Sequence, residues 1–550
     1  MSQAVYYGVR WRSVVGSMMD RSACLSYGAA MAEPTNRSDR PKRDSNKGPR
    51  KTGSGSKAPY KGGGGFKGKP GGKPGSKGGG YKGKSGDARG GSKGGGRPSG
   101  SRDGDKPAAR AWPRPTREKM TNAQAARKAA AMAVGDVLGR GFRLEGSLAK
   151  NLALEGLDAR DRGFARAIAA TTLRRLGQID AVLAPLVQRP PPGRVQAYLQ
   201  TATAQMVFMD VAPHAAVGDT VNLIKADSKS EPFAGLANAV LRKVAEIGKA
   251  EAAKVPPTQN IPGWLRSEWM RLYGKPTVRR MALMLSMSPP LDISVKKDPE
   301  AWAKTLGGQI IGETTVRLDS IGNVTALEGF KDGAWWVQDM AAALPARILE
   351  QACEGLSGKR VADLCAAPGG KSMQLCAMGA EVTAIDVSEA RTMRLTQNLE
   401  RTGSKATVIT SDLNDYEPEA LFDAVLLDAP CSATGTFRRR PDVLYNRSER
   451  DITPLTRLQD TLLKRAAKCV APGGVLLYAV CSLQEREGAA RVNKFRKAMP
   501  EFGLVKLTEI PGLDLPDGRL DDGMLRILPP DAPDGRGLDG FFIAVLKRTE

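Results

Sequence analysis

The chain has 550 residues and a formal net charge of +25. That length is too great for one hydrophobic core and predicts several folded units. The charge favours a polyanionic partner, either nucleic acid or an acidic membrane surface. No run approaches the roughly 18 consecutive apolar residues that a membrane-spanning helix needs, so we expect no membrane span.

The cysteine and histidine content narrows the chemistry. Seven cysteines are scattered along the chain without a CxxC pair, and His214 is the only histidine. This pattern argues against a disulfide framework and a structural zinc site, and it predicts a reducing, cytoplasmic location without a bound metal. His214 lies far from the motifs of the C-terminal half. Zinc deaminase chemistry and Ser-His-Asp hydrolysis are therefore not expected there.

Residues 1–118 are predicted to be a disordered, basic Gly/Lys-rich tail. Gly occupies 21 of the 50 positions from 51 to 100, and residues 31–120 carry 24 Lys/Arg against 7 Asp/Glu. Such a segment has too little apolar surface to offset its ordering entropy. Its lysines and scattered aromatic residues suit weak RNA binding, and a solubilising tail is the alternative. The first 30 residues lack a secretory h-region, and Met31 offers a second start; a weak transit peptide stays open.

Residues 119–255 change to helical periodicity. Ala-rich segments place apolar residues three and four positions apart at Thr121–Gly135, Arg160–Gln178, Thr201–Val211 and Pro232–Ile247. No alternating strand pattern intervenes, so we expect a separate all-helical domain. Residues 256–340 predict a small α+β subdomain, with strands at Leu291–Val295 and Thr315–Leu318 and a helix at Pro299–Leu306.

Residues 341–550 alternate between strand and helix patterns. The expected strands are Arg360–Leu364, Glu381–Ile385, Ala406–Thr410, Phe422–Leu427, Gly474–Val480, Met524–Leu528 and Phe541–Leu546. Helices are expected at about 371–379, 388–402 and 456–470. The alternation predicts an α/β, Rossmann-like domain with a mainly parallel seven-stranded sheet whose last two strands form an antiparallel edge.

A glycine-rich loop follows the first of these strands. The segment Cys365-Ala-Ala-Pro-Gly-Gly-Lys371 lets the backbone approach a ligand closely, and the helix it opens favours an anionic group at its N-terminus. Asp386 ends the second strand, where an acidic residue commonly accepts hydrogen bonds from a ribose. Asp412 follows the third strand and suits an adenine-like ring. Three successive strand ends of this kind predict a nucleotide-type site.

Two cysteines follow the next two strands. Asp428-Ala-Pro-Cys431 ends one strand, and Cys481 ends the other. Two thiols at the carboxyl ends of parallel strands predict nucleophilic chemistry by cysteine if a positive neighbour or a helix N-terminus lowers a thiol pKa. Lys371, the arginines 438–440 and a helix starting near Leu483 are the candidate sources of that charge. The spacing alone leaves open which thiol is the nucleophile.

The segments Asp363–Ser372, Asp428–Gly435 and Tyr478–Gly488 resemble the Sun/Fmu-type RNA cytosine-C5 methyltransferases. Further matches are Val337-Gln-Asp339, Arg438-Arg-Arg-Pro-Asp442 and Asp539-Gly-Phe-Phe542. The helical region resembles the NusB-like RNA-binding domain of the RsmB type through Pro213-His-Ala-Ala-Val217 and Asn238-Ala-Val-Leu-Arg242. The resemblance covers about residues 120–548.

The resemblance implies a role for each motif. S-adenosylmethionine would be held by Cys365, Ala366, Ala367, Pro368, Gly369, Gly370, Lys371, Asp386, Asp412 and Asp428. Cys481 would attack C6 of a flipped-out cytosine, Asp428 would bond the base edge near N3, and Cys431 would assist release. The implied substrate is 16S ribosomal RNA or a small-subunit precursor, and we expect a monomer.

Three positions depart from the family pattern. Val480 stands where Thr is usual, Glu485 where Pro is common, and Arg440 where His or Asn is usual. None of these changes removes a catalytic group. Two rival functions stay open: a methyltransferase acting on tRNA, against which the NusB-like domain argues, and a non-catalytic RNA-binding scaffold, against which the two cysteines argue.

Overall fold

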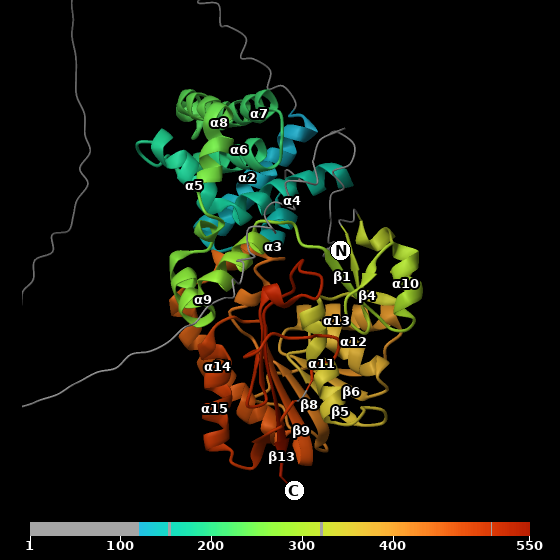
Figure 1. Ribbon diagram of the computed structural model, residues 1–550. Helices are drawn as coiled ribbons and strands as arrows, with labels where there is room; N and C mark the ends of the chain where they lie inside the picture. The colour runs from blue at the N-terminus through green and yellow to red at the C-terminus, as the bar shows by residue number, and fades with distance from the viewer. Residues whose placement is uncertain (1–119, 152–155, 320–322, 508, 550) are drawn as a thin grey trace, which may run out of the picture. The chain divides into compact units, whose positions relative to one another are not determined.

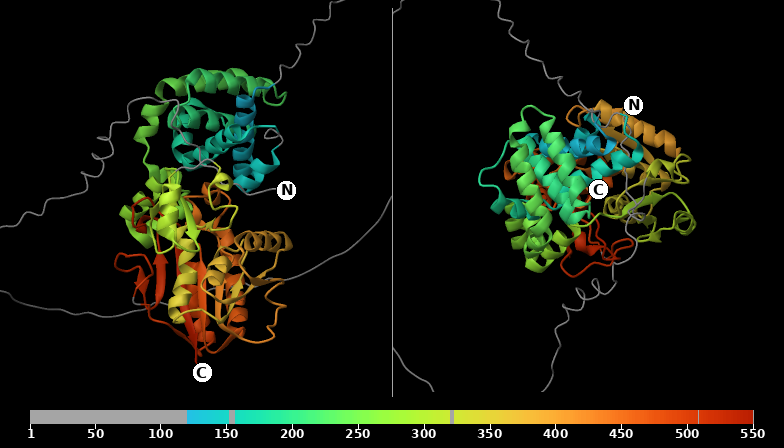
Figure 2. Two further views of the ribbon diagram at one scale, coloured as in Figure 1. Left: turned by 90° about the vertical axis from the view of Figure 1, so that its right-hand side faces the viewer. Right: turned by 90° about the horizontal axis from the view of Figure 1, so that it is seen from above.

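The computed structural model describes residues 120–549 apart from 152–155, 320–322 and 508. The predicted basic tail therefore lies outside the described residues. Figures 1 and 2 show a group of helices that comes first in the chain, a small sheet, and a larger sheet with helices on both faces.

The first part of the described chain is all-helical, as predicted. It contains α2 (Asn122–Arg140), α3 (Leu144–Lys150), α4 (Ala159–Arg174), α5 (Leu176–Leu183), α6 (Gly193–Phe208), α7 (Pro213–Lys225) and α8 (Ala234–Lys254). Helix α2 begins in a capping box, in which the Thr121 side chain accepts from the Gln124 amide. The segment Arg160–Gln178, whose sequence has helical periodicity, spans parts of two helices, because Arg175 leaves helical geometry at φ −112° and ψ 12°.

A small subdomain follows and contains an antiparallel four-stranded sheet. Its strands β1 (Leu291–Val295), β2 (Gln309–Ile310), β3 (Thr315–Leu318) and β4 (Trp335–Val337) lie in the order β2-β3-β1-β4, beside α10 (Pro299–Leu306). The long helix α9 (Gly263–Leu285) precedes it. Helix α9 buries Trp269 in one cluster with Phe437 and Leu483 of the larger sheet's loops. The segment before residue 341 therefore shares a core with the α/β domain.

The larger sheet has the strand order β11-β12-β13-β9-β8-β5-β6-β7, with β10 paired to β13. The five strands β5 (Arg360–Leu364), β6 (Glu381–Asp386), β7 (Ala406–Thr410), β8 (Phe422–Asp428) and β9 (Val470–Val480) run parallel. β12 (Met524–Ile527) and β13 (Phe541–Arg548) supply the predicted antiparallel edge. The short β10 (Phe502–Leu504) and β11 (Leu520–Asp521) extend the expected seven strands to nine.

Helices cover both faces of this sheet (Figure 1). Strand residues alternate between two buried clusters, as the period of a β-strand requires. One cluster joins Val361 and Leu426 to α11 (Met340–Ala352), α12 (Gly370–Ala377) and α13 (Glu389–Thr402). The other joins Leu364 and Val425 to α14 (Glu449–Lys468) and α15 (Ala489–Ala498). The parallel strands are thus buried on both sides, and their carboxyl ends share one edge.

One expected helix differs from the structure. The prediction of a helix starting near Leu483 is wrong, since only the short 3-10 turn Glu485–Glu487 follows Cys481. Gly488 has φ −103° and ψ −115°, which breaks the chain away from helical geometry, and α15 starts at Ala489. Within the described residues, none of the helices has the length and apolar character that crossing a membrane requires.

Candidate active site

The glycine-rich loop has the geometry of a close-approach turn. Gly369 has φ +102°, and a Cβ there would lie 2.4 Å from the Leu395 Cδ1 atom. The loop also contains Cys365 at φ +62° and a cis peptide bond before Pro368. Glycine is therefore required at 369, and the loop presents backbone to the carboxyl edge of the sheet. Its end opens α12, as predicted.

Asp386 forms hydrogen bonds with the backbone of this loop. Its side chain is 1% exposed, and its carboxylate accepts from the Ala367 amide at 3.2 Å and the Ser388 amide at 3.2 Å. Arg391 pairs with the same carboxylate at 3.1 Å. The predicted residue thus lies at the loop, but its oxygens are engaged by the protein. Asp412, by contrast, is exposed and accepts from the Asn414 amide at 2.9 Å.

Lys371 and Asp428 form an ion pair between two of the predicted motifs. The Lys371 Nζ lies 2.7 Å from the Asp428 Oδ2, with side chains 10% and 29% exposed. Burial alone would lower the pKa of Lys371, but Asp428, Asp363 and the Cys481 sulfur raise it overall. The lysine therefore carries its charge at the same strand edge as both thiols.

The two predicted thiols are in contact. Sγ of Cys431 lies 3.5 Å from Sγ of Cys481, although 50 residues separate them in the chain. Both residues are partly exposed. The loops also join through the backbone, since the Gly435 amide donates to the Cys481 carbonyl at 3.0 Å. A Cβ at Gly435 would lie 2.0 Å from the Gly540 carbonyl oxygen, so only glycine permits this approach.

The surroundings of the two thiols differ. The hydrogen bond to Cys481, burial, and the negative charges of Glu487 and Asp428 together raise the pKa of Cys431 well above its ordinary value. Lys371 interacts with Cys481 instead. The hydrogen bond, burial and the neighbouring negative charges therefore keep the Cys431 thiol protonated at neutral pH.

The other thiols of the α/β domain are less suited to chemistry. Burial, with Asp386 and Asp428 nearby, raises the pKa of Cys365 to about 12. Burial also raises the pKa values of Cys353, Cys376 and Cys469 to about 11. These groups stay protonated at neutral pH and are poor nucleophiles.

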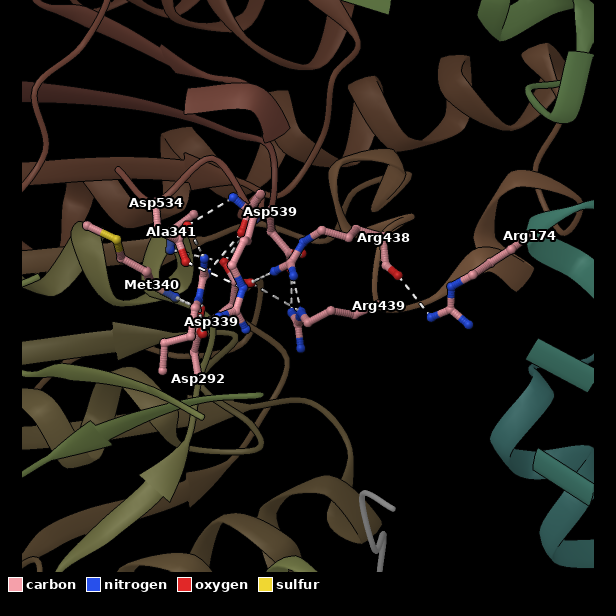
Figure 3. A network of polar contacts seen from close by, with 12 residues as sticks. Arg174, Asp292, Asp339, Met340, Ala341, Arg438, Arg439, Asp534 and Asp539 are labelled. Carbon is pink, nitrogen blue, oxygen red and sulfur yellow. Dashed lines mark hydrogen bonds and ion pairs between the residues drawn. The ribbon is translucent and has the colours of Figure 1, made fainter. Parts of the chain in front are cut away.

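Arg438 and Arg439 do not serve as positive neighbours of the thiols. Arg438 pairs with Asp339, and Arg439 donates to Asp539 through Nε at 2.9 Å (Figure 3). The Asp539 amide in turn donates to the Asp339 carboxylate at 2.9 Å. We call these four residues the ion network. It joins three family-like motifs that lie about 100 or 200 residues apart, and it pairs the guanidinium groups of one motif with the carboxylates of the other two.

The same loop contacts the helical domain. Arg174 donates to the Arg438 carbonyl at 3.1 Å (Figure 3). The buried Asp442 accepts from the Leu144 amide at 3.3 Å, and Tyr445 donates to the Leu173 carbonyl at 2.8 Å. The segment after Cys431 therefore connects the thiol site with the helices.

Comparison with known proteins agrees with this architecture. The 16S rRNA methyltransferase RsmB/F family matches residues 352–547, and the NusB family matches residues 124–246. Ribosomal RNA small subunit methyltransferase B of Pseudomonas putida is 34% identical over 444 residues, which cover 76% of this chain and 98% of the relative. The chain belongs to the RsmB/F family. The resemblance stated from the motifs is confirmed.

Other relatives give the same result. Ribosomal RNA small subunit methyltransferase B of Xanthomonas campestris is 36% identical over 449 residues, covering 77% of this chain and 97% of the relative. A solved structure titled PH0851 matches the fold with a TM-score of 0.63 at 23% identity, covering 78% of this chain and 99% of that one. The protein is a methyltransferase of ribosomal RNA that uses S-adenosylmethionine.

The residues at the strand edge fit this cofactor. The loop at Gly369 lies at the carboxyl end of β5 and opens the N-terminus of α12. The buried Asp363 accepts from the Ser372 hydroxyl at 2.6 Å, but its Oδ1 has no hydrogen-bond partner among the described residues. Burial raises the pKa of Asp363 to about 7. An unpaired carboxyl oxygen beneath the loop suits the ammonium group of the cofactor's amino-acid end.

Sequence reasoning missed two buried acidic residues, Asp363 and Glu487. Asp363 lies inside a quoted motif and is the fourth residue of its strand, on the face of Val361 rather than that of Leu364. A carboxylate within an otherwise apolar strand was the available signal for it. Glu487 bonds to both thiol loops, and nothing in its local sequence distinguishes it from the two neighbouring charged residues.

Proposed function

We propose that this methyltransferase modifies C5 of a cytosine in 16S ribosomal RNA through a covalent bond between Cys481 and C6 of the base. The observation that carries the proposal is the 3.5 Å contact between Cys431 and Cys481 beside the Lys371–Asp428 pair. C5 of cytosine is unreactive until a nucleophile adds at C6. A thiol at the carboxyl edge of the sheet can be that nucleophile.

The proposed reaction assigns different work to the two thiols. The Cys481 thiolate adds to C6, and the electron pair moves to C5, which takes the methyl group that S-adenosylmethionine supplies. A base such as water then takes the C5 proton, and the C5–H electron pair forms the C5–C6 double bond again. The bond between Cys481 and C6 breaks, and its electron pair returns to the Cys481 sulfur. Cys431 lies in contact with the Cys481 sulfur and is the group placed to assist that release.

Asp428 is proposed to bond the edge of the target base near N3. Its side chain is 29% exposed, although Lys371 occupies one oxygen. The base has to leave its stack to reach this edge of the sheet, which costs roughly a few kcal/mol and least for an unpaired nucleotide. A loop or bulge of the RNA is therefore the expected target.

A group of arginines near the thiol loops supports an RNA substrate. The pKa of Arg143 is lowered first by burial and then by the positive charges of Arg440, Arg447 and Arg391. Arg447 also donates to the Ser432 carbonyl at 3.3 Å, next to Cys431. Mutually repelling guanidinium groups beside a reactive site favour a phosphate ligand. The substitution of Arg440 for the usual His or Asn adds to this charge.

The choice of substrate and setting follows from the relatives and the domains. Small-subunit ribosomal RNA is favoured over tRNA because the NusB match accompanies the methyltransferase match. The six cysteines of the described chain are free thiols, which supports the proposed cytoplasmic location. We further propose that a monomer suffices, because both thiols and the cofactor loop come from one chain.

Product analysis tests this function. The purified protein is incubated with unmodified small-subunit RNA and a labelled methyl donor, and the nucleosides are then separated. We expect labelled 5-methylcytidine, and bisulfite sequencing locates the modified position. A different methylated nucleoside would overturn the C5 assignment. Stronger labelling of tRNA than of ribosomal RNA would overturn the substrate assignment.

A further inference from the structure

A buried polar cluster lies directly behind the two thiols. Ser432 follows Cys431, and Ser482 follows Cys481, so each thiol has a serine as its next residue. The two serine hydroxyls lie 3.0 Å apart, and both donate to the same carboxylate oxygen, Oε2 of Glu487. None of these three side chains is exposed. One carboxylate therefore connects the residues adjacent to both thiols.

The second oxygen of Glu487 is also fully engaged. Oε1 accepts from the Ser432 amide at 2.9 Å and from the Gln459 side chain of α14 at 3.0 Å. The Glu487 carbonyl accepts from the Tyr478 hydroxyl of β9 at 2.7 Å. We call Glu487 with Ser432, Ser482 and Gln459 the glutamate cluster. It ties both thiol loops to β9 and α14.

The amide, hydroxyl and side-chain amide groups that donate to this carboxylate are neutral. A carboxylate accepts at both oxygens, whereas an amide accepts at one and donates at the other. Replacing Glu487 by Gln puts an NH₂ group at one of the two oxygen positions. There it faces either two N–H donors, from the Ser432 amide and the Gln459 side chain, or two serine hydroxyls that would have to accept instead of donate. Each unsatisfied buried group destabilises the local arrangement. Glu487→Gln therefore breaks or reverses two of the hydrogen bonds in the cluster that joins the thiol loops.

We propose that Glu487 is a positioning residue that holds the Cys431 and Cys481 sulfur atoms in contact and so permits release of the methylated RNA. The inference rests on the proposed two-thiol function. The thiol loops are 50 residues apart in sequence and come from different strands. The glutamate cluster and the backbone bond from Gly435 to Cys481 are polar ties between them. A further tie is the bond that the Leu483 amide donates to the Thr434 hydroxyl at 3.0 Å. Loosening the cluster would separate the sulfur atoms without removing either thiol.

The distance between the thiols can be tested without RNA. Hydrogen peroxide converts two adjacent thiols to a disulfide and two water molecules. The rate is measured as the loss of two hydrogens from the linked Cys431 and Cys481 peptides by mass spectrometry. We expect Glu487→Gln to slow this reaction at least tenfold. Glu485→Gln is the matched control, since Glu485 lies in the same turn with a 56% exposed side chain. Its rate should equal that of the native protein.

Turnover is measured on the same variants. For Glu487→Gln we expect kcat to fall by 10- to 100-fold, with KM for RNA within threefold, and a covalent protein–RNA complex to accumulate. If Glu487→Gln does not fold, Ser482→Ala removes one of the donors and should show the same effects at smaller size. Disulfide and kcat rates within twofold of the native protein in both variants would overturn the inference.

The two proposals fail in different ways. If Cys481→Ala retained methylation, the covalent mechanism would be wrong, whatever the peroxide reaction showed. If Cys481→Ala were inactive but Glu487→Gln left the sulfur contact and kcat intact, the mechanism would stand and the positioning role would be wrong.

Discussion

Two buried polar networks hold the same stretch of chain between β8 and α14, and they differ in kind. The ion network of Asp339, Arg438, Arg439 and Asp539 satisfies carboxylates with guanidinium groups. The glutamate cluster satisfies a carboxylate with hydroxyl, amide and side-chain amide donors. The ion pairs join Arg438 and Arg439 to Asp339 at the start of α11 and to Asp539 just before β13. In the glutamate cluster neutral groups donate to Glu487, whose negative charge lies near Cys431. We therefore expect the ion network to contribute to folding stability and the glutamate cluster to position the two thiols.

The largest expected effect is the loss of methylation when a thiol held by the glutamate cluster is removed. Cys481→Ala should reduce methylation by at least about a thousandfold, because it removes the nucleophile. Its melting temperature should stay within a few degrees of the native value. Cys376→Ala is the control, since that thiol lies on α12 away from the pair. Initial rates with labelled methyl donor measure the effect. Residual activity above a tenth of the native rate would contradict it.

The next effect tests the structural side. Asp339→Ala removes the close ion-pair partner of Arg438, which is 1% exposed, and leaves it only the longer 3.9 Å pair with Asp539. We expect the free energy of unfolding to fall by about 3–5 kcal/mol in urea denaturation. Glu246→Ala removes an exposed partner of Lys243 and should change it by less than about 1 kcal/mol. Equal losses in the two variants would show that the ion network carries no special stability.

The cofactor loop offers a smaller effect that sharpens the comparison. Gly369→Ala strains the backbone at φ +102° and crowds Leu395, which should cost about 1–3 kcal/mol. We expect KM for S-adenosylmethionine to rise roughly tenfold. Gly403→Ala provides the control, because Gly403 has φ +59° but no atom near its added Cβ. If Gly369→Ala left the KM for S-adenosylmethionine unchanged, the assignment of this loop to the cofactor site would be wrong.

The last prediction concerns Asp363 and pH. Burial raises its pKa to about 7 in the folded protein, above its ordinary value near 4. The folded state then binds the proton more tightly, so this group's contribution makes stability fall as pH rises from 4 to 7. Asp363→Asn should remove a slope of at most about 1.4 kcal/mol per pH unit. Parallel pH profiles of the unfolding free energy for both proteins would contradict this.

The positions of the two thiols at the edge of the sheet can be predicted from the sequence, but the buried polar residues that hold their loops cannot. The apolar runs before Cys431 and Cys481 end where the strands end, so both thiols could be placed at one edge. Gly369 could be recognised from its loop. The contacts of Glu487 could not be recognised from the sequence, because its partners lie on three separate segments: the loop after β8, the loop after β9, and α14. The same holds for Asp339 and Asp539, which are 200 residues apart.

Two elements escaped prediction for local reasons. Helix α9 is interrupted by Gly274 at φ +77° and contains Pro276, which obscure its periodicity. The helix expected after Cys481 is absent because Gly488 breaks the chain before Ala489. In both cases glycine or proline, the residues least suited to a helix interior, sets the element's limits.

Trapping of the covalent intermediate tests the two-thiol account most directly. Cys431→Ala is incubated with small-subunit RNA and S-adenosylmethionine and then run on a denaturing gel. The account predicts a protein–RNA complex that survives denaturation in Cys431→Ala and is absent when Cys481→Ala is added. A complex that persists in the double variant, or no complex in Cys431→Ala during turnover, would contradict it.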